Sequence, residues 1–140
     1  MKNTLVYKFG GTSLGNPSSI LAVTKIIGAT KGKTVIVVSA MGGTTDKLLS
    51  AAKDAAKGRL EAAQIASVEF KNRHMDAIKG LIKNPIRAEF LKNFILESTE
   101  EFKSICSSLL VLKEHTPRIL DVTVARGEKS HSKDCRGGFK

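Results

Sequence analysis

The 140-residue chain has room for one domain, and its 41% hydrophobic and 26% charged residues are typical of a globular protein and exclude a fibrous or wholly disordered one. Its apolar runs are far shorter than the roughly 18 residues that cross a bilayer, and two cysteines make no disulfide framework, so we expect a cytoplasmic protein without a membrane partner. The net charge of +10 suits a polyanionic partner, but the basic residues are dispersed and aromatic residues make up only 5%, which disfavours nucleic acid.

The first third of the chain has the pattern of a strand, a helix and a second strand. Alternating apolar side chains over residues 5–9 predict a strand that ends at a glycine pair. Asn16 followed by Pro17 predicts a helix N-terminus, because Asn caps the first turn and Pro fits its first position; the apolar stripe ends near Gly28. The β-branched run over residues 34–38 predicts a strand that is buried on both faces. Two parallel strands joined by a right-handed helical crossover satisfy this order.

The middle of the chain, from residue 46 to about 113, has a helical pattern in which apolar residues recur every three to four positions. Beyond it, the apolar residues over 119–124 fit a strand and a buried helix equally. Residues 129–140 are mostly polar and show neither periodicity, so we expect a divergent tail there. Element boundaries are predicted at Gly58, at Asn84-Pro85 and at Thr116-Pro117.

Two loops rich in glycine and hydroxyl side chains follow the two predicted strands. Lys8 stands at the end of the first strand, and its ammonium, the amides of the loop and the following helix are the parts of a phosphate cradle. An ordinary Gly-Gly turn fits the spacing as well. Residues 42–45 repeat this composition after the second strand, and ligands of open parallel sheets bind at the carboxyl ends of strands, so we expect one site there. The first loop contains Gly10, Gly11, Thr12 and Ser13.

Neither the histidines nor a lone carboxylate offers a metal or catalytic site by spacing. His74, His115 and His131 fit no ligand pattern, and we expect them on the surface or in the tail, with no protein ligand for a metal. The segment over residues 28–34 fails as a P-loop, because three residues instead of four separate its glycines. Glu128, taken alone, is typical of a solvated loop.

Several segments of the sequence resemble aspartokinases, a group within the amino acid kinase family. VYKFGGTSLG over residues 6–15 is similar to the opening signature of that group, and VVSAMGGTTDKL over residues 37–48 continues the resemblance. TPRILD over residues 116–121 and GEKS over residues 127–130 resemble later elements. The resemblance therefore extends from about residue 5 to residue 130.

The resemblance implies transfer of a phosphoryl group from ATP, accompanied by Mg²⁺, to the side-chain carboxylate of L-aspartate, the first step toward lysine, threonine and methionine. Lys8 would neutralise charge on the transferring phosphate, within a cradle formed by residues 10–13. Ser39 and Thr45 would contact aspartate, and Glu128 would pair with its α-ammonium group. Members of the family are expected to be homo-oligomers, with protein ligands of Mg²⁺ outside this chain.

The resemblance also implies an α/β fold class: the N-terminal half of a three-layer α/β/α fold with a mainly parallel sheet, incomplete in this chain. Residues 1–128 would form the N-terminal part of an aspartokinase catalytic domain, and residues 129–140 the divergent tail. We then expect an open sheet edge, one uncovered apolar face and no activity from the isolated chain. A family member with another acid substrate, a non-catalytic remnant and a small basic binding module remain alternatives.

Overall fold

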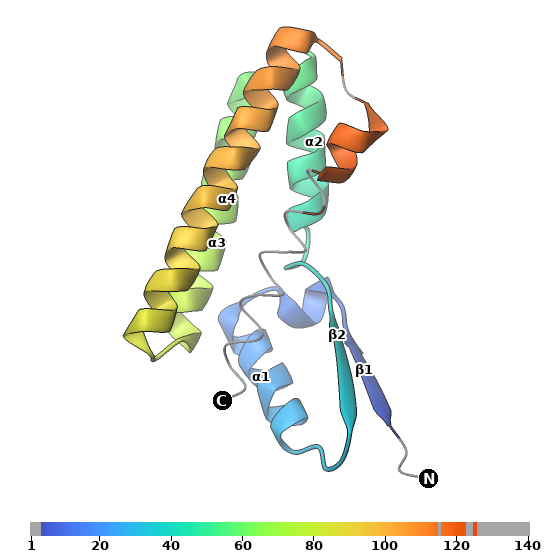
Figure 1. Ribbon diagram of the computed structural model, residues 1–140, viewed down its shortest axis with the longest axis vertical. Coiled ribbons are helices and arrows are strands. Elements are labelled where there is room, and N and C mark those ends of the chain that lie inside the picture. Colours follow the sequence, from blue (N-terminus) through green and yellow to red (C-terminus); the bar gives the residue numbers. More distant parts are fainter. Residues whose placement is uncertain (1–3, 115, 123–124, 126–140) are drawn as a thin grey trace.

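The computed structural model describes residues 4–114, 116–122 and 125. It shows an α/β unit at one end of the molecule and long helices lying side by side at the other (Figure 1). In chain order the elements are β1 (Leu5–Phe9), the short 3₁₀ helix η1 (Gly11–Leu14), α1 (Pro17–Gly28), β2 (Thr34–Val38), α2 (Thr44–Ala56), α3 (Leu60–Leu81) and α4 (Pro85–Leu112). The molecule is therefore mostly helical with a small parallel sheet.

The β1–α1–β2 unit confirms the predicted order of strand, helix and strand. β1 and β2 pair in parallel, with Phe9 opposite Val38 at their carboxyl ends. Asn16 caps α1, since its Oδ1 accepts a hydrogen bond from the Ser19 amide at 2.9 Å. α1 covers one face of the strand pair and forms a small core with it. The buried residues of this core are Phe9, Leu14, Ile20, Val23, Met41 and Ala77.

The opposite face of the two strands is open to solvent. Val6, Val35 and Val37 are 67%, 46% and 44% exposed, so the prediction that residues 34–38 are buried on both faces is wrong. The physical reason is that α1 covers one face only, while the three long helices pack with one another. The predicted uncovered apolar face is present.

α2, α3 and α4 pack around a second and larger core, and the breaks between them fall at the predicted residues. Gly58, between α2 and α3, has a φ of +89°, a left-handed conformation that favours glycine. Asn84 caps α4 by accepting a hydrogen bond from the Arg87 amide at 3.0 Å. Large buried side chains of this core include Leu48, Phe70, Ile78, Leu91, Ile95, Phe102 and Leu109.

The segment that begins at Thr116 is helical over residues 117–122, which decides between the two structures that its spacing allowed. The Ile119 amide donates to the Thr116 carbonyl at 3.0 Å, as expected at a helix start. Ile119 and Leu120 pack against the larger core, so contact with the long helices stabilises this segment. Among the described helices, none combines the length and apolar character that a membrane span needs.

Candidate functional site

The loops that follow β1 and β2 meet at the carboxyl end of the sheet. The Ser39 amide donates to the Phe9 carbonyl at 3.1 Å, and the Gly42 amide donates to the Gly11 carbonyl at 3.0 Å. A Cβ atom on Gly11 would lie 2.9 Å from the Gly42 Cα, and one on Gly42 would lie 2.9 Å from the Gly11 oxygen. Glycine is therefore needed at both positions for the backbones to approach this closely.

The first loop turns through η1 directly after β1. The first hydrogen bond of η1 runs from the Ser13 amide to the Gly10 carbonyl at 3.0 Å, so the amides of Gly11 and Thr12 precede it and have no partner within the helix. Leu14 is fully buried and anchors the turn. Thr12 and Ser13 are exposed. The loop thus presents amides and hydroxyls, which are donors that phosphate oxygens accept.

Lys8 lies one residue before the end of β1 and is exposed. It is in register with Val37, and strand alternation puts it on the open face, away from α1. Within residues 4–114, 116–122 and 125 its ammonium has neither a hydrogen-bond partner nor an ion-pair partner. The Lys8 ammonium is therefore free to pair with an anion bound at the loops, as far as the described residues show.

The second loop enters α2 through Gly43, whose φ of +75° is left-handed. The first hydrogen bond of α2 runs from the Lys47 amide to the Gly43 carbonyl at 3.2 Å, so Thr45 lies in the first turn, where the helix dipole is positive. Thr45 is half-buried. Ser39, at the start of the loop, donates its hydroxyl to the Ala40 carbonyl at 3.3 Å. Ser39 therefore lies at the start of the second loop, and Thr45 lies just beyond its end, in the first turn of α2.

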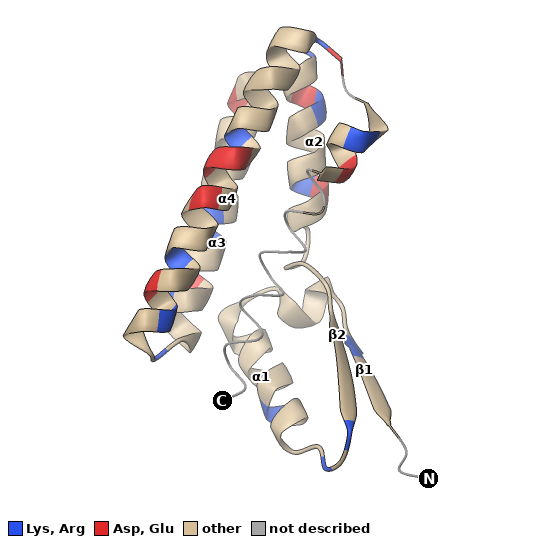
Figure 2. Cartoon of the chain, in the orientation of Figure 1, with Lys and Arg blue, Asp and Glu red and all other residues tan. Residues whose placement is uncertain are grey.

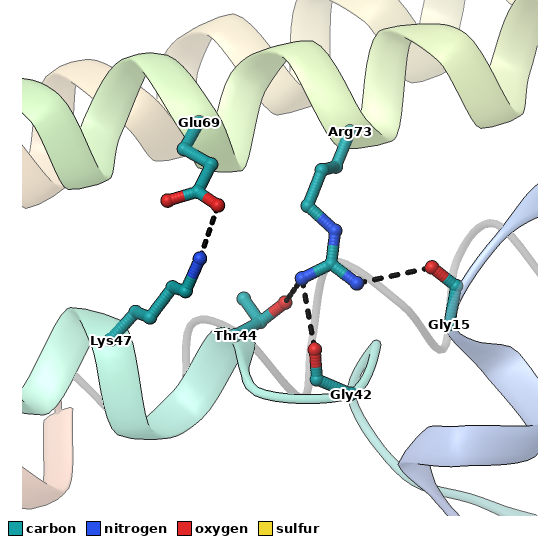
Figure 3. Close-up of polar contacts among 6 residues, drawn as sticks. All are labelled: Gly15, Gly42, Thr44, Lys47, Glu69 and Arg73. Carbon is teal, nitrogen blue, oxygen red and sulfur yellow. Dashed lines mark hydrogen bonds and ion pairs between the residues drawn. The ribbon is translucent and has the colours of Figure 1, made fainter.

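A side chain that sequence reasoning missed ties both loops to α3. Arg73 donates from Nη1 to the Gly42 carbonyl at 2.9 Å and to the Thr44 hydroxyl at 3.3 Å, and from Nη2 to the Gly15 carbonyl at 3.0 Å (Figure 3). Arg73 and Gly15 are 58 positions apart in the sequence, so no local pattern joins them. The sequence offers one weak signal for Arg73: it precedes His74 on α3, so it lies at the border of the helix face that buries Phe70.

The space between α2 and α3 beside Arg73 is too small for a substrate. Lys47 and Glu69 form an ion pair there (Figure 3), and the free volume is about 10 Å³, which is at the lower limit for a single water molecule. The space between α2 and α3 therefore does not hold a ligand of the two loops.

The charge around the two loops is positive. Along the sequence the first carboxylate is that of Asp46, in the first turn of α2. Figure 2 shows Lys and Arg without Asp or Glu on the β1–α1–β2 unit, and both signs on the long helices. Among the described residues, no group of three or more His, Cys, Asp or Glu could hold a metal ion. The surroundings of the loops therefore favour an anion over a cation.

His74 is fully buried on α3, so the prediction that it lies on the surface is wrong. It falls at helical spacing between the buried Phe70 and Ala77. Burial lowers the pKa of His74 from 6.5 to about 4, while the Phe70 carbonyl raises it and the nearby Arg73 lowers it further. His74 is thus neutral at neutral pH. Burial also raises the pKa of the Cys106 thiol to about 11, which leaves this thiol unreactive.

Glu128, His115 and His131 lie outside the described residues, as does the tail over residues 129–140. Of the predicted site residues, the structure places Lys8, residues 10–13, Ser39 and Thr45 in or next to the two loops at the carboxyl end of the sheet. The pairing of Glu128 with an α-ammonium group stays a prediction.

Comparison with known proteins adds two kinds of similarity. Residues 3–126 match the amino acid kinase family. The chain is 30% identical over 124 residues to the chloroplastic bifunctional aspartokinase/homoserine dehydrogenase 2 of Zea mays, covering 88% of this chain and 13% of that protein. It is 33% identical over 128 residues to the chloroplastic aspartokinase 1 of Arabidopsis thaliana, covering 89% of this chain and 21% of that protein. The chain thus spans about a fifth or less of the length of these relatives.

Solved structures share the fold. Aspartokinase III of E. coli in its R-state, in complex with aspartate and ADP, superposes with a TM-score of 0.74 at 20% identity, covering 96% of this chain and 28% of that chain. The T-state of the same enzyme, in complex with lysine and aspartate, gives a TM-score of 0.69 at 19% identity, with the same coverage.

Proposed function

This chain belongs to the amino acid kinase family, and from that membership we propose that it is the phosphate-cradling and aspartate-binding part of an aspartate kinase. The observation that carries the proposal is the junction of two glycine loops at the carboxyl ends of both strands, with the exposed Lys8 one residue before the end of β1. The aspartokinase relatives support the choice of aspartate as the acceptor.

The proposed reaction transfers the γ-phosphoryl group of ATP to the side-chain carboxylate of L-aspartate. A carboxylate oxygen attacks the γ-phosphorus while the bond to the oxygen of the leaving ADP breaks, which gives 4-phospho-L-aspartate. Negative charge on the phosphoryl oxygens is stabilised by fixed positive groups. Lys8 supplies an ammonium for this purpose, and the amides and hydroxyls of residues 10–13 hold the phosphates.

Aspartate would lie over the second loop. Ser39 offers a hydroxyl group at the start of this loop, and Thr45 offers one in the first turn of α2. The positive dipole of that turn favours a carboxylate. Glu128 would accept hydrogen bonds from the α-ammonium group, and such a charge-assisted contact would separate an amino acid from a simple diacid.

The two loops suit ATP phosphates and do not suit Mg²⁺. Residues 10–15 and 39–45 contain no carboxylate, which is the ligand that Mg²⁺ prefers. Any protein ligands of the ion would therefore come from outside the two loops. The homo-oligomeric assembly and the cytoplasmic location likewise stay predictions.

The test compares Lys8→Ala with Lys33→Ala in a full-length enzyme whose catalytic domain has residues 1–128 as its N-terminal part. Lys33 is an exposed lysine at the opposite end of the sheet. We expect Lys8→Ala to lower kcat by about 100-fold or more, with a much smaller change in KM for aspartate, because its charge acts mainly on the transition state. Lys33→Ala should leave both constants unchanged.

Glu128→Gln in the same enzyme should show the opposite split, with weaker aspartate binding and unchanged ADP binding in calorimetry. Near-normal turnover of Lys8→Ala would contradict the role of the lysine. ATP consumption that depends on a different acid, and not on L-aspartate, would contradict the proposed substrate.

A further inference from the structure

Arg73 joins three parts of the molecule that are distant in sequence. Its guanidinium lies between the end of the first loop at Gly15, the second loop at Gly42 and the α2 N-terminus at Thr44 (Figure 3). We propose that Arg73 is a positioning residue for phosphoryl transfer, which sets the separation of the two glycine loops and makes that separation depend on the position of α3. This inference rests on the proposed function.

The contacts of Arg73 use the shape of the guanidinium group. Nη1 bonds to the second loop and Nη2 bonds to the first, so the rigid plane between the two nitrogens fixes the distance between their acceptors. A lysine has one nitrogen at the end of a flexible stem and cannot span both loops with fixed geometry. A substitution of Arg73 by lysine keeps the positive charge but loses the planar guanidinium, so we expect it not to hold the two loops together.

The partners of Arg73 indicate a backbone clamp and not an ion pair. Its recorded acceptors are two carbonyls and one hydroxyl, all neutral. The nearby carboxylate of Glu69 is paired with Lys47. No ion pair between described residues includes Arg73. The hydrogen bonds of this side chain thus go to the two loops and to the first residue of α2.

The packing of α3 does not depend on Arg73. The side chain is only half-buried, whereas α3 is held in the larger core by buried side chains such as Phe70 and Ile78. A substitution at Arg73 should therefore leave the helices folded and change the geometry of the loops. This separates positioning from a general contribution to stability.

The experiment uses Arg73→Lys, Arg73→Ala and the control Arg59→Lys in the enzyme that contains residues 1–128. Arg59 is an exposed arginine that pairs with Asp54 away from the loops. We expect both Arg73 variants to lower kcat by about 10- to 100-fold, because small displacements of reacting groups have effects of this size. Lysine should not rescue alanine, and Arg59→Lys should behave as the unmodified enzyme.

A readout independent of activity is hydrogen exchange of the peptide over residues 39–48, measured without ligands. Both Arg73 variants should exchange faster there, with the melting temperature and the exchange of α4 little changed. Full activity of Arg73→Lys, or unchanged exchange over residues 39–48, would overturn the inference. If Lys8→Ala abolishes turnover while Arg73→Lys does not alter it, the inference alone fails. If the unmodified enzyme shows no aspartate-dependent turnover, the proposed function fails, and exchange still reports on the clamp.

Discussion

His74 is buried with only one of its two ring nitrogens bonded. Nδ1 lies 2.8 Å from the Phe70 carbonyl, and since a carbonyl only accepts, Nδ1 carries the proton. Nε2 is then the unprotonated nitrogen, and it is buried without a hydrogen-bond partner in the described structure. Protonating Nε2 would place a charge in the core beside the aromatic ring of Phe70, which is why the neutral ring is favoured.

This arrangement makes stability depend on pH. The pKa of His74 is about 4 in the folded chain and 6.5 without burial, so the unfolded state binds more protons between these values and stability falls as pH falls through that window. The loss should be complete near pH 4 and on the order of 3 kcal/mol. Urea unfolding at pH 7 and pH 4.5 should therefore show a smaller decrease for His74→Leu than for the unmodified chain. Equal decreases would contradict the assignment.

Single residues were predictable where their partners are close in sequence. Asn16 and Asn84 cap helices through amides three positions away, and each could be identified from the residues around it. His74 and Arg73 could not, because their surroundings are created by other elements. The burial of His74 depends on how the helices pack, and the acceptors of Arg73 lie 29, 31 and 58 positions away.

At the scale of elements, the two glycine loops behave as one unit because their backbones touch. Gly11→Ala would put a Cβ atom 2.9 Å from the Gly42 Cα, and backbone atoms cannot move aside as a flexible side chain would. We expect a loss of about 1–3 kcal/mol in the free energy of unfolding, as for other overpacked sites. Urea denaturation of the 140-residue chain measures this loss.

Gly28→Ala is the matched control, since nothing lies within 4 Å of a Cβ atom at the end of α1. It should not destabilise the chain, because alanine is at least as favourable as glycine there. If Gly11→Ala were as stable as Gly28→Ala, the close contact of the loops would not persist in solution.

The order of elements was predictable from periodicity and breaks, but their burial was not. The strand over residues 34–38 was expected from its β-branched run and forms, yet one of its faces is open. A continuous apolar run does not say which neighbours cover it. For residues 119–122 the spacing allowed a strand or a helix, and contact with the larger core accompanies the helix.

At the scale of the whole molecule, one apolar surface is uncovered. Val6 and Val35 are exposed on the open face of the sheet, and among the described residues each strand has a neighbour on one side only. Exposed apolar strands associate with one another. We expect the 140-residue chain to self-associate with rising concentration in sedimentation velocity despite its charge of +10.

Val6→Lys should reduce this association, because a lysine on an edge strand opposes pairing. Val111→Lys is the control, since Val111 is as exposed but lies at the end of α4. A monomeric unmodified chain, or equal reduction by both variants, would show that the sheet face is not the associating surface.

The contacts of Arg73 also have a consequence for folding during synthesis. Residues 1–45, which contain both strands and both glycine loops, are synthesised before residue 73. The nascent α/β unit must therefore spend part of its synthesis without the side chain that bridges Gly15 and Gly42. The loops reach their final form only when the chain folds back across 58 positions and the loop-closure entropy is overcome. The β1–α1–β2 unit, whose elements are predictable from local sequence, thus depends on the long-range contact of Arg73 with Gly15 to complete its loops.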